Sequence, residues 1–226
     1  MIDVLYKDEE IIVANKPSGM LVHPYNGRRN REPTLLHELR DQEELYLYPL
    51  HRLDRPVSGA IVFGLTKKAT SVIKENWNND ETRKEYITLV RGRITESGKF
   101  DDPMKNDRKK MQEAITLYDP IKYYPEYDVS LLRVSLKTGR KHQIRRHFCR
   151  FYYNLIGDTM YGKGSINIIF REIFQLNRIF LHAHKLSFIH PTKNELIEIK
   201  APLSQELIQT LEKMNTEPEI IQSLSH

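Results

Sequence analysis

One apolar segment and the helix predicted after it constrain the fold of this chain most. Gly59–Leu65 reads GAIVFGL, a run of apolar and β-branched residues whose length suits a buried strand. Thr66 can cap the N-terminus of a helix predicted over 67–78. The apolar residues of that helix recur at helical spacing and give it one face to bury. This strand and helix are the clearest elements of the predicted fold.

The remaining elements do not alternate between strand and helix in a regular order. Further strands are predicted at 11–14, 86–90, 127–136, 179–189 and 196–200. Further helices are predicted at 34–39, at 141–152 and after Ser204. Because a βαβ rhythm is missing, we predict an α+β fold with a mixed, largely antiparallel central sheet flanked by helices and loops.

Three segments are predicted to lack regular structure. Residues 26–33 are polar and basic, so we expect a loop there. Residues 157–167 contain three glycines and are also predicted to be a loop. The chain is expected to fray from Asn215 to its end.

The composition excludes several classes of protein. Hydrophobic residues make up 39% and charged residues 29% of the 226 residues, which suits a folded domain with a real core. The only cysteine is Cys149, so an intrachain disulfide and a cysteine-based zinc site are excluded. No segment approaches the roughly 20 apolar residues that span a bilayer, and no signal peptide is recognisable. We therefore expect a cytoplasmic protein without a membrane partner.

Motifs that hold nucleotide cofactors or metals are also missing. The sequence contains neither GxxxxGK[ST] nor GxGxxG after a strand. Its histidine pairs, His142/His147 and His182/His184, have no acidic neighbour that would complete a metal site. We expect no cofactor and no metal.

The first chemical signal is a lone carboxylate in a basic window. Between Leu45 and Lys74 the only acidic residue is Asp54, which stands between two arginines in HRLDRP at 51–56. Nearby cations favour the ionised form of a carboxylate, and an ionised carboxylate beside a rigid strand is a plausible nucleophile. The alternative is an aspartate that pairs with the local arginines to fix a turn.

The second signal is a window from Val129 to Gly157 that contains no acidic residue. It holds nine arginine, lysine and histidine side chains: Arg133, Lys137, Arg140, Lys141, His142, Arg145, Arg146, His147 and Arg150. A helix over 141–152 would bury Ile144, Phe148 and Phe151 and place Gln143, Arg146 and Arg150 on the opposite side. A solvated basic face usually includes compensating acids, so this window indicates binding of nucleic acid or another polyanion.

Together, the two windows and two further blocks resemble the pseudouridine synthase family of ribosomal and transfer RNA, in the group with an HRLD motif. The matching blocks, in the family's order, are NKPSG at 15–19, HRLDRPVSG at 51–59, KEY at 84–86 and TGRKHQIRRH at 138–147. LHAH at 181–184 and HP at 190–191 also look like the family. The similarity spans nearly the whole chain, and four ordered blocks are highly specific.

Two details narrow the resemblance, and one departs from it. Arg55-Pro56 and the doubled Arg145-Arg146 look most like the tRNA pseudouridine-65 synthase group. Val57 stands where the family usually has Thr, so one hydroxyl is missing from this loop. The N-terminal RNA-binding appendage of many relatives is not expected here.

The resemblance implies which residues carry the chemistry. Asp54 would be the essential carboxylate, which attacks C1′ of the ribose, attacks C6 of the uracil, or takes a sugar proton to form a glycal. Arg145 would pair with Asp54 and keep it ionised and oriented. Tyr86 would stack on the uracil and relay the C5 proton, and Ile144 would contact the base.

The resemblance also implies how the RNA is held. Arg52 would occupy the space that the flipped uridine leaves in the stem. His51 would be a structural residue or an RNA contact, and Arg140, Arg146 and Arg150 would meet phosphates. The expected architecture is a pseudouridine synthase domain over 1–214, with its active-site cleft across the sheet and a tail at 215–226. We expect it to work as a monomer.

Three rival functions differ in what they need from these residues. A ribosomal RNA uridine is the closest alternative to a tRNA target. A catalytically silent RNA-binding protein would keep the basic windows without needing Asp54, Tyr86 and Arg145 together, and all three are present. A metal-dependent nuclease would need further carboxylates beside Asp54, and none is near it in the sequence.

Overall fold

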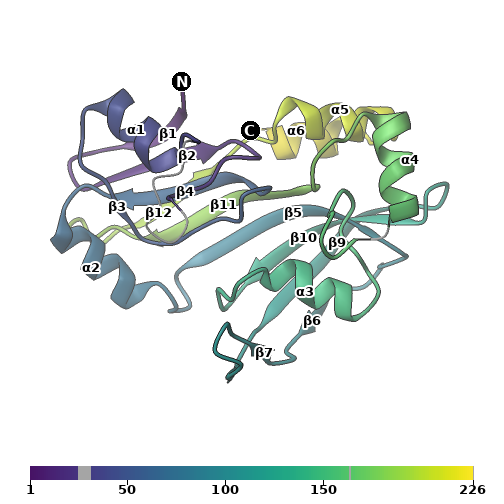
Figure 1. The fold of residues 1–226 in the computed structure, drawn as a ribbon, viewed down its shortest axis with the longest axis horizontal. Helices are drawn as coiled ribbons and strands as arrows, with labels where there is room; N and C mark the ends of the chain where they lie inside the picture. Colours follow the sequence, from purple (N-terminus) through teal and green to yellow (C-terminus); the bar gives the residue numbers. More distant parts are fainter. Residues whose placement is uncertain (25–31, 163, 226) are drawn as a thin grey trace. The chain divides into compact units, whose positions relative to one another are not determined.

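The strand predicted at Gly59–Leu65 is β4, Ser58–Gly64, in the computed structural model, and all seven of its residues are buried (Figure 1). Its neighbours in the sheet are β2 (Ile11–Lys16) and β11 (Leu181–Ile189). The pairing of β2 with β4 is antiparallel and places Lys16 opposite Gly59. The end of β2 therefore lies beside the start of β4, where the HRLDRP segment enters the strand.

The described part of the chain, residues 1–24, 32–162 and 164–225, divides into two units. Unit 1 contains 1–83 and 183–201, and unit 2 contains 84–182 and 202–226. The loop predicted at 26–33 lies outside the described residues except for its last two positions. Both units contribute to the stretch predicted as a catalytic domain, 1–214, whose limits stay a prediction.

Unit 1 is built on the strand order β1-β2-β4-β11, with β12 paired to β11 and β3 paired to β4. Its other elements are β1 (Asp3–Lys7), α1 (Leu35–Glu43), β3 (Tyr48–Pro49), α2 (Lys67–Asn76) and β12 (Leu196–Lys200). As predicted, the Thr66 side chain caps α2 by accepting a hydrogen bond from the Ala69 amide at 3.0 Å. One face of the sheet forms a core with Ile73 of α2 and the partly buried Trp77 that follows the helix.

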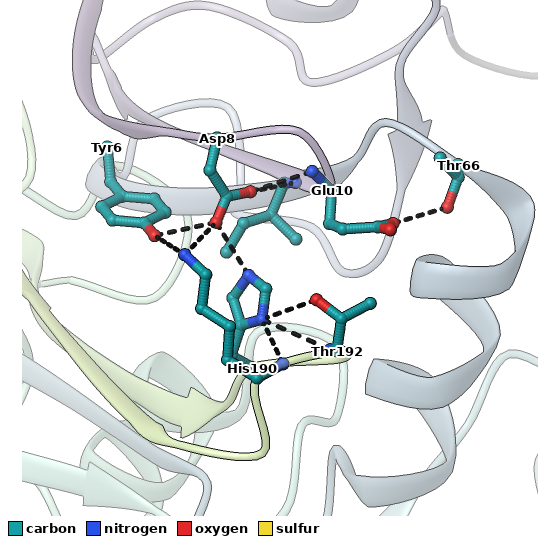
Figure 2. A network of polar contacts seen from close by, with 8 residues as sticks. Tyr6, Asp8, Glu10, Thr66, His190 and Thr192 are labelled. Atoms are coloured by element: carbon teal, nitrogen blue, oxygen red, sulfur yellow. Dashed lines mark hydrogen bonds and ion pairs between the residues drawn. The ribbon is translucent and has the colours of Figure 1, made fainter.

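A polar network in unit 1 joins two turns that are far apart in the sequence (Figure 2). The Asp8 carboxylate accepts hydrogen bonds from the amides of Glu10 and Ile11, from the Tyr6 hydroxyl and from His190 Nε2. Burial alone would raise the pKa of Asp8, but the two amides, the Tyr6 hydroxyl and the Lys193 ammonium outweigh burial and lower the pKa. Because Asp8 precedes β2 and His190 follows β11, the network ties the β1–β2 turn to the β11–β12 turn.

Unit 2 contains the strand order β5-β10-β9-β6 and a separate two-stranded hairpin. The strands are β5 (Arg83–Arg91), β6 (Gly98–Phe100), β9 (Thr116–Tyr124) and β10 (Val129–Leu136), and the hairpin is β7 (Met104–Lys105) with β8 (Met111–Gln112). The helices are α3 (Gln143–Arg150), α4 (Gly164–Phe174), α5 (Gln205–Lys213) and α6 (Pro218–Ser225).

The two faces of the unit 2 sheet pack against different helices. Ile87 and Leu89 of β5 share one core with buried residues of α4, α5 and α6. Side chains alternate along a strand, so Tyr86 points to the other face. On that face Tyr86 pairs with Val134, and Val134 pairs with Tyr118, whose ring contacts Phe148 of α3 at a centroid distance of 5.7 Å. Tyr86 and α3 therefore lie on the same side of this sheet.

The fold class predicted from the sequence is confirmed: the protein is α+β with a mostly antiparallel sheet. Within the described ranges, no helix is long and apolar enough to cross a membrane.

Three local predictions were wrong. The loop predicted at 157–167 ends where α4 begins, at Gly164, because Phe170 and Phe174 bury one side of a helix that the glycines had obscured. The expected fraying from Asn215 is wrong for α6, since Leu224 is buried and its carbonyl accepts from the Leu203 amide at 3.2 Å. Phe151 does not join the buried stripe of α3, because the helix ends at Arg150.

Replacement of Gly59 by alanine tests how closely β4 packs on β11. Gly59 has φ of +112°, and a Cβ atom there would overlap the Ala183 carbonyl oxygen of β11. We expect Gly59→Ala to lower the free energy of unfolding by about 3 kcal/mol or more, since backbone strain and overlap add. Urea unfolding measures this, with Gly164→Ala as the control because its added Cβ would meet nothing within 4 Å. Equal losses in the two variants would contradict the packing argument.

Candidate active site

The segment that carries Asp54 is anchored on both sides of the carboxylate. Leu53 and Val57 are buried, whereas Asp54 between them is half-buried. The Val57 amide donates to the Asp54 carbonyl at 3.0 Å and closes a turn at Arg55-Pro56. The backbone of Asp54 is thus fixed immediately before the fully buried strand β4.

The Lys16 ammonium holds the backbone of this turn in place through hydrogen bonds. Lys16 has no exposed surface, and its Nζ donates to the carbonyls of Pro17 at 2.8 Å, Met20 at 2.7 Å and Arg55 at 3.1 Å. A buried ammonium needs such acceptors in place of water. Lys16 therefore joins the KPSG segment to the residue that follows Asp54.

Further bonds join the same two segments. The Gly19 amide donates to the Arg55 carbonyl at 2.9 Å, and Arg55 Nε donates back to the Gly19 carbonyl at 2.8 Å. Ser18 Oγ donates to the Pro56 carbonyl at 2.8 Å. These bonds and those of Lys16 do not use the Asp54 carboxylate. The turn has its own supports, which weakens the alternative that Asp54 is present to fix it.

His51 is tied to the strand that it precedes. Its Nε2 accepts a hydrogen bond from the Val62 amide at 3.2 Å, which fixes the neutral ring with its proton on Nδ1. The ring packs on Trp77 with a centroid distance of 4.7 Å. These contacts support a structural role for His51, and its contact with RNA stays a prediction.

A shallow hollow of about 130 Å³ lies beside the Asp54 turn in unit 1. It is lined by Leu21, Val22, His23, Pro24, Arg52, Leu53 and Arg55. Arg52 is exposed at this hollow, and Arg55 also pairs with Glu32 at 3.0 Å. The surroundings of Asp54 in unit 1 therefore offer cationic side chains to an anionic ligand.

In unit 2 the predicted partner residues Tyr86, Ile144 and Arg145 are all largely buried. Tyr86 lies on the sheet face that α3 covers, and Ile144 and Arg145 belong to the first turn of α3. Arg145 is only 4% exposed, so its guanidinium requires a fixed partner.

Asp158 is a partner of Arg145 that sequence reasoning missed. Arg145 Nε donates to Asp158 Oδ2 at 2.7 Å and Nη2 donates to Oδ1 at 3.0 Å, a bidentate pair. Asp158 Oδ1 also accepts from the amides of Met160 and Tyr161. Burial alone would raise the pKa of Asp158, but Arg145 and these amides outweigh burial and lower the pKa. Asp158 is therefore ionised and matches the charge of Arg145.

Two other side chains complete the support of this ion pair. Asn167 of α4 donates to the Asp158 carbonyl at 2.9 Å and accepts from the Gly157 amide at 2.8 Å. The Tyr161 ring lies 5.0 Å from the Arg145 guanidinium carbon. One signal pointed to this arrangement: Asp158 is the first acidic residue after the acid-free window.

Gln143 was predicted on the polar side of α3, and that prediction was wrong. The residue is buried, and its side chain bonds Thr138 Oγ1 at 2.8 Å, the Arg140 amide at 2.9 Å and the Ile115 carbonyl at 3.0 Å. Gln143 thus links the residues of the TGRKHQ segment to one another and to the residue that precedes β9.

The arginines predicted to meet phosphates differ in exposure and partners. Arg140 donates from Nε to the Glu113 carbonyl at 2.8 Å and remains partly exposed. Arg146 is half-buried and donates to the carbonyls of Lys141 and Lys105 at 3.3 and 3.1 Å. These bonds hold each guanidinium in one orientation at the surface of unit 2.

Two of the histidines considered as metal ligands, His147 and His184, are buried and bond other groups. His147 Nδ1 bonds Thr116 Oγ1 at 2.8 Å, its Nε2 bonds the Asp102 carbonyl at 3.0 Å, and His184 Nδ1 bonds the Ala201 carbonyl at 3.0 Å. Among the described residues no group of three or more His, Cys, Asp or Glu side chains could hold a metal ion.

The predicted site residues fall into two sets. Unit 1 contributes Asp54, Arg52 and His51, and unit 2 contributes Tyr86, Ile144, Arg145, Arg140 and Arg146. Within unit 2, Tyr86 and Arg145 come from a strand and from the helix that covers the same face of its sheet.

Substitution of Lys16 tests the support of the Asp54 turn. Lys16→Met keeps the length of the side chain but removes the Lys16 donor from the Pro17 and Met20 carbonyls, whereas the Arg55 carbonyl keeps its bond from the Gly19 amide. We expect a loss of roughly 2–4 kcal/mol in the free energy of unfolding, because unsatisfied buried acceptors cost about 1–3 kcal/mol each and removal of the buried charge offsets part of this. The measurement is denaturant unfolding, with Lys7→Met as control.

Lys7 pairs with Glu43 at 2.9 Å on an exposed surface, so its loss should change stability by less than about 1 kcal/mol. If Lys16→Met were as mild as Lys7→Met, Lys16 would not be the support described.

The sequence of this chain is similar to those of known proteins. A family model described as RNA pseudouridylate synthase matches residues 10–149. The chain is 35% identical to "tRNA pseudouridine synthase C" of Vibrio vulnificus over 100% of both chains, and 37% identical to "tRNA pseudouridine synthase C" of Haemophilus ducreyi over 91% of this chain and 92% of that one.

Two solved structures share the fold. "Human RNA Pseudouridylate Synthase Domain Containing 4" aligns with a TM-score of 0.74 at 22% identity, over 95% of this chain and 94% of that chain. "Human RNA Pseudouridylate Synthase Domain Containing 1" aligns with a TM-score of 0.69 at 21% identity, over 96% of both. The sequence matches cover far more than half of the chain, so this protein belongs to the RNA pseudouridylate synthase family and is an isomerase that acts on uridine in RNA.

Proposed function

We propose that this isomerase acts on transfer RNA and that its uridine is at position 65, in the T stem. The observation that carries the choice of tRNA is full-length similarity to relatives named tRNA pseudouridine synthase C. The position is supported by the likeness of Arg55-Pro56 and Arg145-Arg146 to the tRNA pseudouridine-65 synthase group.

The reaction is an isomerisation without net redox change. The C1′–N1 bond of uridine breaks, the uracil turns, a C1′–C5 bond forms, and the C5 proton is lost as N1 gains one. The chemistry needs a group that acts at the sugar or the base, a support for the turning uracil and a route for the C5 proton. The proposal assigns these tasks to Asp54, Ile144 and Tyr86.

Asp54 is the reacting carboxylate in this proposal. Its backbone is fixed by the turn and by the bonds between the KPSG segment and Arg55-Pro56, and none of those bonds uses its carboxylate. Attack on C1′, attack on C6 and removal of a sugar proton all begin from the same ionised carboxylate. A fixed turn limits the entropy that is lost when that carboxylate reaches the nucleoside.

Arg145 is proposed to orient Asp54 without neutralising it. Asp158 already matches the guanidinium charge through two short bonds. A second carboxylate beside this pair would form a group with a net charge of −1, so Asp54 would keep its basicity and nucleophilicity. An Arg145 without Asp158 would instead stabilise the Asp54 carboxylate by about 4 kcal/mol at 4 Å and an effective dielectric constant near 20, and make it less reactive.

Tyr86 and Ile144 are proposed to face the uracil. Both are held by the unit 2 core, Tyr86 on β5 and Ile144 on α3, and both are largely buried. A phenol ring on a rigid strand can stack on a flipped base, and its hydroxyl can take up the C5 proton. Arg52, exposed in the hollow of unit 1, would fill the space that the uridine leaves in the stem.

Phosphate contacts are assigned to Arg140 and Arg146, with His51 as a support of the Asp54 turn. Both arginines keep exposed surface while backbone carbonyls orient them. RNA affinity that depends on such contacts falls as salt rises.

Asp54→Asn tests the catalytic assignment. Asparagine keeps the shape of the turn but cannot act as nucleophile or base, so we expect at least a 10³-fold loss of turnover while the Kd for tRNA changes less than about 3-fold. Turnover is followed by tritium release from C5-labelled, unmodified tRNA. Asp41→Asn, an exposed change in the same unit, is the control and should keep full activity. Full activity in Asp54→Asn would refute the assignment of Asp54.

The identity of the uridine is tested in cells. Pseudouridine mapping of total RNA from a strain that lacks this gene should show loss at position 65 of tRNA, and restoration by the wild-type gene but not by Asp54→Asn. Loss at a ribosomal RNA site with tRNA intact would replace the tRNA assignment by the rRNA alternative and leave the family assignment in place.

A further inference from the structure

A second hollow lies in unit 2 between α3 and the β7–β8 hairpin. Its volume is about 250 Å³. It is lined by Asp102, Pro103, Met104, Lys105, Met111, Arg146, His147 and Arg150. Its lining combines charged, apolar and buried polar groups. These groups indicate the chemistry of the ligand that the hollow can bind.

Cations dominate the charge of this hollow. Lys105, Arg146 and Arg150 face one carboxylate, that of Asp102. The pKa of His147 is lowered, chiefly by burial, although the Asp102 backbone carbonyl opposes the shift, so the ring is neutral at pH 7. The net charge of the lining is +2, which suits an anionic ligand.

The hairpin and α3 are tied together in a way that orients these cations. Arg146 Nη2 donates to the Lys105 carbonyl at 3.1 Å, and Lys141 pairs with Asp107 of the hairpin turn at 2.9 Å. Arg150 Nη2 lies 3.0 Å from Asp102 Oδ1. A guanidinium that is already oriented loses less entropy when it binds a ligand.

Apolar groups line another part of the same hollow. Met104 is buried, whereas Met111 is 54% exposed. A thioether side chain adapts its shape to an apolar contact. The apolar part suits a carbon-rich group attached to the anion.

We propose that this hollow binds one phosphodiester of the substrate RNA, with its phosphate on Arg146 and Arg150 and its ribose against Met111. The proposal rests on the proposed function and adds a binding site outside the reacting groups. Arginine matches a phosphate through two parallel N–H bonds, and three cations with one apolar contact fit a sugar–phosphate unit. Lys105 adds a third positive charge at the rim.

Asp102 distinguishes this site from an ordinary basic surface. Its carboxylate pairs with Arg150 where the phosphate would bind, so phosphate and carboxylate compete for one guanidinium. Removal of the carboxylate should therefore strengthen RNA binding. The Arg150–Asp102 pair is substantially exposed, with side chains 60% and 28% accessible, so it contributes only about 0–1 kcal/mol to stability. Asp102→Asn should fold normally.

The experiment measures the Kd for unmodified tRNA at several KCl concentrations for four full-length variants. We expect Arg150→Ala to weaken binding about 5- to 10-fold and to reduce the slope of log K against log[KCl] by about 1, because one phosphate contact is lost. Asp102→Asn should tighten binding about 3-fold. Met111→Ser should weaken binding with an unchanged slope. Arg171→Ala, an exposed arginine on α4, is the matched control and should change Kd less than 2-fold.

The outcomes separate this site from the proposed function. The site is overturned if Arg150→Ala behaves like Arg171→Ala, or if Asp102→Asn fails to tighten binding. It is also overturned if polyglutamate competes with tRNA for the wild type as strongly as a second RNA does, since the hollow would then bind acidic protein chains. The control Arg171→Ala should keep wild-type turnover, whereas failure of the proposed function would appear as full turnover in Asp54→Asn.

Discussion

A lysine ammonium with no exposed surface requires a complete set of acceptors, and in this protein that requirement shapes the turn that carries Asp54. Lys16 can be buried because three carbonyls replace water, and one of them belongs to Arg55, the residue after Asp54. The pairing of β2 with β4 brings the Lys16 backbone opposite Gly59. The strand register, the KPSG segment and the turn therefore depend on one another, and a shift in any of them would leave a buried charge unsatisfied.

The two aspartates central to the proposal have contrasting environments. Asp158 is buried, receives two bonds from Arg145 and two from backbone amides, and has its pKa lowered by them. Asp54 is half-buried, and the Val57 amide donates to its backbone carbonyl. The proposal gives Asp158, which is buried and accepts four hydrogen bonds, the role of positioning a cation, and gives the less buried Asp54 the reacting role.

The charge distribution and the strand pattern of the sequence predicted part of the fold and part of the candidate site. The buried strand β4 and the Thr66 cap followed from local sequence, and Asp54 was the only acid of its window, whereas Arg145 was singled out through the family resemblance. The sequence did not reveal the hydrogen bonds of Lys16, because their acceptors are backbone carbonyls that any residue provides. The start of α4 was missed because Gly162 and Gly164 are typical of loops, while the burial of Phe170 depends on distant residues.

The burial of Arg145 also accounts for Asp158, the first acidic residue after the acid-free window. An arginine that is only 4% exposed stays charged, and its burial without a counter-ion would strongly destabilise the fold, so one carboxylate must reach it from outside the window. If Asp54 alone served as that counter-ion, every step that changed the charge of Asp54 would leave Arg145 uncompensated. In the proposed mechanism, Arg145 would keep Asp158 as its partner while Asp54 attacks, becomes neutral or accepts a proton. The buried pair would then separate the charge balance of the fold from the charge changes of the proposed reaction.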